Sequence, residues 1–456
     1  MSNGMYTATT PDNSIDLQQT VRTQKRRSAI RAAFFSEFID MFDIYLPVLS
    51  LAPVMFLFQP AHLSPQAQSL LASLVFITTL LGRPIGALLF GMMADRIGRR
   101  AASIYSVSGF GVVTFLIAIL PDYQTLGIAS YLLLVLLRFV DGIFLGGGYT
   151  GAIPLAIEYS RKNQRGFVGG LILAGFPAAY VTINLITMLM FYLFPLNGPN
   201  SPYTIWGWRI PFIFGAVLAG ILALYYKYRV AESEIWIQKE DKTKKTEKLP
   251  LSSLLSGKNG WNLLQVLILM TGFWLTQNII TIFLPTGMLR HHLHLDGFEL
   301  TGTLMITYAV LFFSYIGSGL LGQAIGRKRF FVIVGPLIAT VGAALFYLLS
   351  QSEGMGFVPR TILVCALAVL VTSPWGIIVT YINERFMTDV RATGFGVGFS
   401  LSVVLPSFYA FYMNWLGALV PATVAPVVLL MIGGAIGTIG ALMGPETKHV
   451  DFEHES

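Results

Sequence analysis

Twelve long apolar segments follow one another along this chain of 456 residues. Each is close to or longer than the roughly 20 residues that a helix needs to cross a bilayer. Hydrophobic residues make up 54% of the chain and charged residues only 12%, about half the charged share that soluble domains have. We therefore expect an all-α membrane protein with twelve transmembrane helices. The segments begin near Ile30, Ala67, Ala101, Ile128, Phe167, Ile210, Leu263, Leu300, Phe330, Thr361, Phe395 and Val424.

The positive charges are concentrated in every second loop. One set of loops contains DRIGRR, SRKNQRG, GRKR and the stretch from Lys227 to Lys258, whereas the alternate loops hold at most one Lys or Arg each. Because cytoplasmic loops of membrane proteins are enriched in Lys and Arg, this asymmetry predicts that both termini are cytoplasmic. It also explains the net charge of +7 without nucleic-acid binding. We expect a multi-pass protein of the plasma membrane, which is the inner membrane in a bacterium.

The two halves of the chain repeat each other, which predicts two six-helix bundles related by an internal repeat. Three charged marks recur at matching places: Gly98, Arg99 and Arg100 with Gly326, Arg327 and Lys328; Glu158 and Arg165 with Glu384 and Arg391; and Glu232 and Ser233 with Glu446 and Thr447. The bundles are expected at residues 29–228 and 261–443. Residues 1–28 and 444–456 then form cytoplasmic tails, and residues 229–260 form a charged cytoplasmic linker.

Several charged residues fall within the predicted membrane segments of the first half. A buried charge in a membrane is costly, so each is a functional hypothesis. Glu37, Asp40 and Asp43 recur at every third position of the first segment and so share one face, which should look toward a cavity. Arg83 lies on the second segment. On the fourth, Arg138 and Asp141 are one turn apart and can pair along the helix.

The segments of the second half have no charged residue in their interiors and offer neutral polar and aromatic groups instead. These are Trp274, Gln277 and Asn278 on the seventh segment, Tyr308 on the eighth and Trp375 on the tenth. This difference predicts a division of labour. The first bundle handles charge and protons, and the second shapes the rest of the substrate site.

A coupling mechanism follows from the buried acids and arginines. Desolvation favours the protonated form of a carboxylate, whereas a nearby arginine favours the charged form. If a substrate carboxylate engages Arg83 or Arg138, the freed aspartate gains a proton, and proton and anion cross together. The proton-coupling candidates are Asp40, Asp43, Asp141 and Glu37. The substrate-binding candidates are Arg83, Arg138, Tyr149, Asn184, Trp274, Gln277, Asn278, Tyr308 and Trp375.

Structural alternatives exist for these candidates. Arg138 and Asp141 can form a purely structural pair, and Glu37 is near enough to the cytoplasmic end to pair with the basic tail. The aromatic candidates can serve packing alone, and Asn184 can simply bond a neighbouring helix. Three histidines in the external loop, at positions 291, 292 and 294, lack the carboxylate or cysteine that would complete a metal site. We expect no catalytic residues, no cofactor and no metal.

The loop after the second segment carries the motif that identifies the chain as similar to a known superfamily. The pattern resembles the signature loop of the major facilitator superfamily, and its residues are Gly91, Asp95, Arg96, Gly98, Arg99 and Arg100. The runs RPIGALLFG, WGWRIPF and RFMTDVRATGFG resemble the metabolite:proton symporters, and IDMFDIY is similar to the aspartate pair of aromatic acid:proton symporters. EYSRKNQRG and GPETK are shared with sugar porters.

This resemblance implies two bundles that rock about a central site and a cytoplasmic gate that closes it. Besides the signature loop, the gate would include Glu158, Arg165, Glu384 and Arg391. Two departures from the pattern matter. Gln323 stands where the second copy of the loop should have an acid, which predicts a weaker latch there. Gly146 to Tyr149 replace the Gly-Gly-Glu-Trp run that metabolite symporters commonly have, so that subfamily does not assign the substrate.

The sequence thus predicts a secondary active transporter and not an enzyme. We expect proton-coupled uptake of a small organic anion, such as a carboxylate or an aromatic acid, by a protein that works as a monomer in the lipid bilayer. The alternatives are uptake of a neutral sugar or polyol, drug efflux, and a transporter-like nutrient sensor.

Overall fold

The computed structural model describes residues 13–60, 63–234, 236–237, 250–295 and 297–452. Within these residues, twelve helical spans are long and apolar enough to cross a membrane, which confirms the predicted class of fold. Several spans include a π-helical or 3-10 segment, and in Arg327–Ser350 such a segment joins two α-helices. The spans are Thr20–Phe58, Leu74–Ile97, Arg99–Ala118, Ile128–Glu158, Lys162–Leu193, Tyr203–Arg229, Gly257–His292, Glu299–Ile325, Arg327–Ser350, Phe357–Arg385, Arg391–Gly417 and Ala425–Met443.

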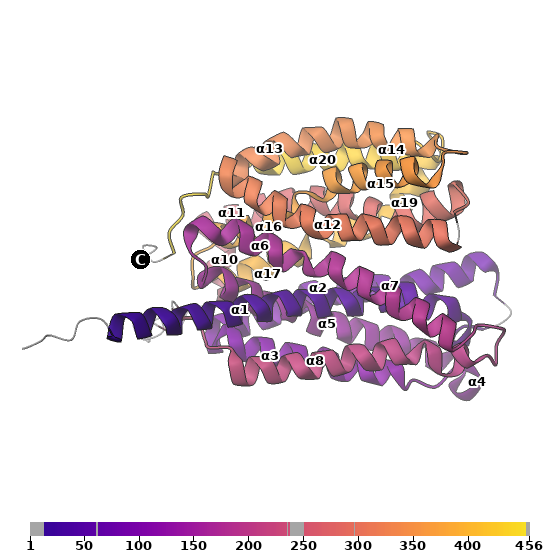
Figure 1. Cartoon of the computed structure of the whole chain (residues 1–456), viewed down its shortest axis with the longest axis horizontal. Coiled ribbons are helices and arrows are strands. Elements are labelled where there is room, and N and C mark those ends of the chain that lie inside the picture. The colour runs from indigo at the N-terminus through magenta and orange to yellow at the C-terminus, as the bar shows by residue number, and fades with distance from the viewer. Residues whose placement is uncertain (1–12, 61–62, 235, 238–249, 296, 453–456) are drawn as a thin grey trace, which may run out of the picture.

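The helices form two bundles that lie side by side (Figure 1). The first bundle contains α1 (Asn13–Leu46), α2 (Pro65–Ile97), α3 (Arg99–Ala118), α4 (Tyr123–Leu126), α5 (Ile128–Glu158), α6 (Arg165–Leu173), α7 (Gly175–Leu193) and α8 (Arg209–Arg229). The second contains α11 (Gly257–Asn278), α12 (Gly297–Ile325), α13 (Arg327–Leu337), α14 (Ala343–Ser350), α15 (Phe357–Thr372), α16 (Trp375–Arg385), α17 (Arg391–Leu401), α18 (Val404–Ser407), α19 (Tyr409–Gly417) and α20 (Ala425–Met443).

The bundles meet along two seams. α2 packs against α17 along one of them, and α6 and α7 pack against α12 along the other. The start of α1 and the last described residues, which follow α20, lie at the same end of the molecule, at the left of Figure 1. We call this the terminal end. The charge pattern of the loops predicts that it faces the cytoplasm.

The predicted tail and linker are partly helical. α1 begins at Asn13, so the predicted boundary between residues 28 and 29 falls inside a continuous helix. α10 (Pro250–Leu255) occupies the last part of the predicted linker, and α11 begins directly after it. The central run KEDKTKKTEK of the linker lies outside the described residues.

The internal repeat is visible in matching local structures at the terminal end. Gly98 precedes α3 with φ of 105°, and Gly326 precedes α13 with φ of 108°. This left-handed region favours glycine because other residues are strained there. Glu232 accepts hydrogen bonds from the backbone of Arg99 and Arg100, at 2.9 and 3.0 Å. In the second half, Glu446 accepts one from Arg327 at 2.8 Å. Each carboxylate therefore caps the start of the helix that follows the glycine.

Candidate functional site

A small cavity lies between the two bundles. Its volume is about 40 Å³, which leaves room for only a few water molecules. Both bundles line it, and six of the predicted site residues are among the lining: Glu37, Arg83, Trp274, Gln277, Asn278 and Trp375. Polar side chains from both bundles therefore meet at this cavity.

Arg83 carries the positive charge of this cavity. It is 2% exposed, and its Nη2 donates a hydrogen bond to Asp40 Oδ2 at 2.7 Å. The guanidinium also lies over the ring of Tyr149, 4.9 Å from its centre. Tyr149 in turn bonds Ser400 of the second bundle. Asp40 itself does not line the cavity, so Arg83 is the member of this ion pair that reaches it.

Polar atoms without partners gather at the same place. Glu37 Oε2, Gln277 Oε1 and Trp375 Nε1 are buried and have no hydrogen-bond partner among the described residues. The second oxygen of Asp40, Oδ1, is also buried and also has no hydrogen-bond partner among the described residues. Buried polar groups are normally satisfied, and an unsatisfied one costs roughly 1 to 3 kcal/mol. A polar ligand, a proton or water at this centre removes that cost.

Arg138 lies away from the cavity, inside the first bundle. Its Nη1 is 2.9 Å from Asp43 Oδ2 and 2.8 Å from Asp141 Oδ2, and its Nε donates to Thr79 at 3.0 Å. Asp43 also accepts a bond from Thr114 at 2.7 Å. The predicted pair along the helix is thus part of a triad. Two carboxylates against one guanidinium carry a net negative charge unless one of them holds a proton.

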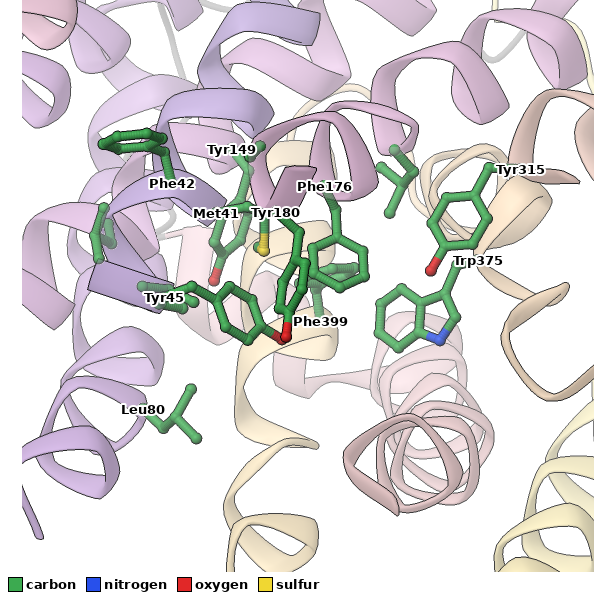
Figure 2. Packing of buried hydrophobic residues seen from close by; sticks show 14 of the residues in the cluster. Met41, Phe42, Tyr45, Leu80, Tyr149, Phe176, Tyr180, Tyr315, Trp375 and Phe399 are labelled. Carbon is green, nitrogen blue, oxygen red and sulfur yellow. The ribbon is translucent and has the colours of Figure 1, made fainter. Parts of the chain in front are cut away.

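An aromatic stack joins the bundles on the side of the cavity that is farther from the terminal end. Tyr180 of α7 and Tyr308 of α12 stack at 3.7 Å between ring centres, with planes 8° apart. Tyr45 packs edge-on against Tyr180 at 5.3 Å, and Figure 2 shows their hydroxyl ends close together. Tyr308 therefore lies in the stack and is absent from the cavity lining. This stack is a direct contact between the two bundles on that side of the cavity.

The rest of the lining is aliphatic and aromatic apart from one threonine, and the sequence interpretation missed most of it. Tyr45, Phe176, Tyr315 and Phe399 all line the cavity, and Figure 2 shows Phe176, Tyr315, Trp375 and Phe399 gathered together. The spacing of Phe176 and Tyr180, four residues apart on one helix, was a usable signal. Asn184 donates to Tyr180 O at 2.8 Å and does not line the cavity.

Asp95 links the two bundles at the terminal end. Its carboxylate accepts hydrogen bonds from Thr393 N at 2.9 Å, Thr393 Oγ1 at 2.6 Å and Ala392 N at 3.3 Å. These groups belong to the first turn of α17, whose free N–H groups favour an anion. A Cβ at Gly91 would lie 2.8 Å from Thr393 Cα, so the glycine permits this close approach. Arg96, in contrast, is exposed.

Two buried glutamates, one from each bundle, also link the bundles at the terminal end, and their partners correspond between the two halves. Glu158 is 3.4 Å from Arg99 of its own bundle and 3.0 Å from Arg391 of the other. Glu384 is 3.1 Å from Arg327 of its own bundle and 3.6 Å from Arg165 of the other. A hydroxyl from the end of the same half completes each set, Ser233 for Glu158 and Thr447 for Glu384. We call these residues and Asp95 the terminal cluster.

Gln323 occupies the place of Asp95 in the second half. Its Oε1 accepts a hydrogen bond from Gly166 N at 3.0 Å, at the start of α6, and another from Arg327 at 2.9 Å. It therefore makes the same kind of contact across the bundles, but with one backbone donor and without a charge. Arg100 points elsewhere and donates to the carbonyls of Tyr226 and Lys227 at the end of α8.

The last described residues, Val450 to Phe452, cover part of the terminal cluster, which no sequence pattern indicated. Phe452 is 4% exposed, and its ring lies 3.6 Å from the guanidinium carbon of Arg165 and 3.8 Å from that of Arg391. Arg165 also donates to Val450 O at 2.8 Å. Because Arg165 and Arg391 come from different bundles, this ring bridges them.

Replacing Phe452 by alanine should loosen the terminal end. A buried cation–π contact contributes about 1 to 2 kcal/mol, so the population with separated terminal ends should rise roughly 5- to 30-fold. Distances between spin labels on the terminal ends of α6 and α17 measure this population in proteoliposomes. Phe411→Ala is the matched control, because Phe411 is 56% exposed on α19. Equal distance distributions in wild type and Phe452→Ala would remove the ring from the contact.

Comparisons with known proteins agree with this architecture. The profile of the Major Facilitator Superfamily matches residues 33–408. The inner membrane metabolite transport protein YhjE of Escherichia coli (strain K12) is 30% identical over 451 residues, which cover 97% of this chain and 99% of that protein. The proline/betaine transporter of Salmonella typhimurium is 28% identical over 438 residues, covering 93% of this chain and 84% of that protein.

The fold is also that of a solved transporter. The structure of the proton:xylose symporter XylE bound to 6-bromo-6-deoxy-D-glucose matches with a TM-score of 0.74 at 17% identity, over 93% of this chain and 97% of that one. The predicted resemblance is therefore confirmed. With twelve spans in two related bundles and a family match over most of its length, this chain belongs to the major facilitator superfamily and is a secondary transporter of metabolites.

Proposed function

We propose that this protein is a proton-coupled symporter that takes up a small metabolite bearing a carboxylate. The observation that carries the proposal is Arg83, a buried guanidinium that lines the cavity and is engaged by Asp40. Arginine suits a carboxylate substrate because its planar fork can bind one with two parallel hydrogen bonds. The cavity lining is otherwise mostly aromatic and aliphatic, which suits a compact organic body.

Charge balance at this centre couples the substrate to a proton. The pair of Arg83 and Asp40 is neutral, so a substrate anion that binds Arg83 leaves one uncompensated negative charge in a desolvated place. Such a charge is expensive, and protonation of Asp40 removes it. Asp40 Oδ1, which has no partner among the described residues, is available for the proton. Proton and anion then cross together, and Asp40 returns to Arg83 after both have left.

Alternating access needs a closure at each end of the cavity. The terminal cluster supplies one, which we place at the cytoplasmic face, and the stack of Tyr45, Tyr180 and Tyr308 supplies the other. The small cavity and the contact between Tyr180 and Tyr308 support our interpretation of this state as one with a contracted site. Separation of Tyr180 from Tyr308 opens the outer side, and loss of the ion pairs across the bundles opens the inner side.

A zwitterion such as an amino acid or a betaine is the second candidate. Glu37 lines the cavity with an unpartnered carboxylate oxygen, and aromatic rings surround it. A carboxylate and aromatic faces together attract a cationic amine. The proline/betaine transporter among the relatives supports this candidate.

Uptake into proteoliposomes with an imposed inward proton gradient tests the proposal. Monocarboxylates, dicarboxylates, aromatic acids, betaine and proline are screened against xylose as the neutral solute. Accumulation of a carboxylate-bearing solute that stops when a protonophore is added is the expected result. If xylose alone accumulates, the neutral-solute alternative replaces the proposal.

Replacing Glu37 by glutamine separates the two candidates. The change removes the only acidic side chain in the cavity lining among the described residues and keeps its size. If the substrate is zwitterionic, we expect its apparent KM to rise roughly 10-fold or more because the amine loses a charged partner. If the substrate is a simple anion, the KM should stay within about twofold or fall. The KM of uptake in proteoliposomes is the measurement, and Glu299→Gln, in a half-exposed carboxylate, is the control.

A further inference from the structure

A second cavity, separate from the transport site, opens between α1 and α8 at the terminal end. Its volume is about 640 Å³, and four cationic side chains line it: Lys25, Arg27, Arg31 and Arg229. No acidic residue is part of this lining among the described residues. The cations converge from the first helix and from the end of the sixth span, which are about two hundred residues apart in the sequence.

Within the described residues, only one of these four cations has an acidic partner. Lys25 pairs with Glu234 at 2.8 Å. In the part of the chain that the structure describes, Arg27, Arg31 and Arg229 form no ion pair with an acid. Three like charges around one concave space repel one another, and an anion between them converts that repulsion into attraction. Hydrogen bonds between the two helices hold the cavity lining in place. Ser28 Oγ donates to Arg229 O at 2.6 Å and lies 3.2 Å from the Tyr225 hydroxyl.

The apolar surface next to the cavity is equally informative. Phe35 follows Arg31 by one helical turn on the same face of α1 and is 48% exposed. On α8, Ile221 precedes Tyr225 of the lining by one helical turn on the same face and is 59% exposed. Both helices thus change from exposed cations to exposed apolar side chains, in the direction that leads from the terminal end into the bilayer. A ligand with an anionic head and a hydrocarbon body matches this order.

We propose that the groove between α1 and α8 binds an anionic phospholipid. Its phosphate lies among Arg27, Arg31 and Arg229, and its acyl chains follow Phe35 and Ile221. Enrichment of cations in cytoplasmic loops accounts for the sign of the charge but not for a concave site shared by two helices. Basic pockets between transmembrane helices at this depth are suited to lipid head groups.

Native mass spectrometry of the purified full chain tests this site. Phosphatidylglycerol and phosphatidylcholine with the same acyl chains are compared in wild type and in Arg31→Gln/Arg229→Gln. Wild type should bind phosphatidylglycerol at least 10-fold more tightly than phosphatidylcholine. The double variant should lose roughly 10- to 30-fold of its affinity for phosphatidylglycerol. If it does not fold, Arg31→Gln alone should lose roughly fivefold.

A control with the same change of net charge gives the test its specificity. Lys258→Gln/Arg329→Gln removes two exposed cations from the terminal end of the second bundle, and its affinity should stay within about twofold of wild type. Glycerol 3-phosphate is the soluble probe and should bind far more weakly than the lipid. Equal binding of both lipids by wild type, an equal loss in the control variant, or equal binding of glycerol 3-phosphate would each overturn the proposal.

Discussion

Replacing Arg83 by lysine should lower uptake roughly 30- to 100-fold although the positive charge is kept. A lysine ammonium cannot bind a carboxylate through two parallel bonds, and it loses the planar stacking over Tyr149 that orients the guanidinium. The substrate complex therefore loses about 2 to 3 kcal/mol of stabilisation. We expect this loss in both KM and maximal rate, because Arg83 also governs the release and recovery of Asp40.

Initial uptake rates in proteoliposomes over a range of substrate concentrations measure this effect. Arg329→Lys is the matched control, since Arg329 is exposed and remote from the cavity. It should transport at the wild-type rate. A rate for Arg83→Lys within twofold of wild type would mean that charge alone is needed, and the assignment of a carboxylate to Arg83 would lose its basis.

Replacing Asp95 by asparagine should reduce transport roughly 10- to 100-fold without loss of insertion. The carboxylate accepts two backbone bonds and one hydroxyl bond from the first turn of α17. Bonds to a charged group contribute about 1.5 to 3 kcal/mol each, and an amide keeps only part of them. The state closed at the terminal end then loses stability, and the outward-open state that depends on it becomes rare.

Asp122→Asn is the matched control for this change. Asp122 also caps a helix, with Thr125 N at 3.0 Å, but this helix is exposed and its contacts stay within one bundle. Uptake by the control should be unchanged, and spin-label distances should show the terminal ends separated only in Asp95→Asn. Wild-type transport by Asp95→Asn would remove the gating role from this account.

Hydropathy and the internal repeat predicted the architecture because both can be read directly from the order of residues along the chain. All twelve spans and the pairing of Gly98 with Gly326 follow from patterns that a single sequence contains. The partners within the terminal cluster could not be read in the same way. Glu158 reaches Arg391 across 233 positions of sequence, and Glu384 reaches back to Arg165. Only the way in which the bundles dock decides that each glutamate pairs with the other half.

The same limit applies to the three acids of the first segment. On a helix, each of Glu37, Asp40 and Asp43 points about 60° away from the next one, because three residues advance about 300° around the axis. Packing alone decides which of them meets Arg83, which meets Arg138 and which enters the cavity. Glu37 in particular is buried at the centre and does not pair with the basic tail among the described residues. Phe452 had no signal at all, since a single aromatic residue near the end of a chain implies no contact.

The most direct measurement compares Asp40→Asn with Asp43→Asn under an imposed inward pH gradient, using the carboxylate that wild type accumulates. We expect Asp40→Asn to lose accumulation but still to exchange internal for external substrate, because Arg83 remains while the proton site is gone. Asp43→Asn should still accumulate substrate, since Asp141 continues to hold Arg138 at 2.8 Å. Accumulation by Asp40→Asn would mean that the Asp40 carboxylate does not carry the proton.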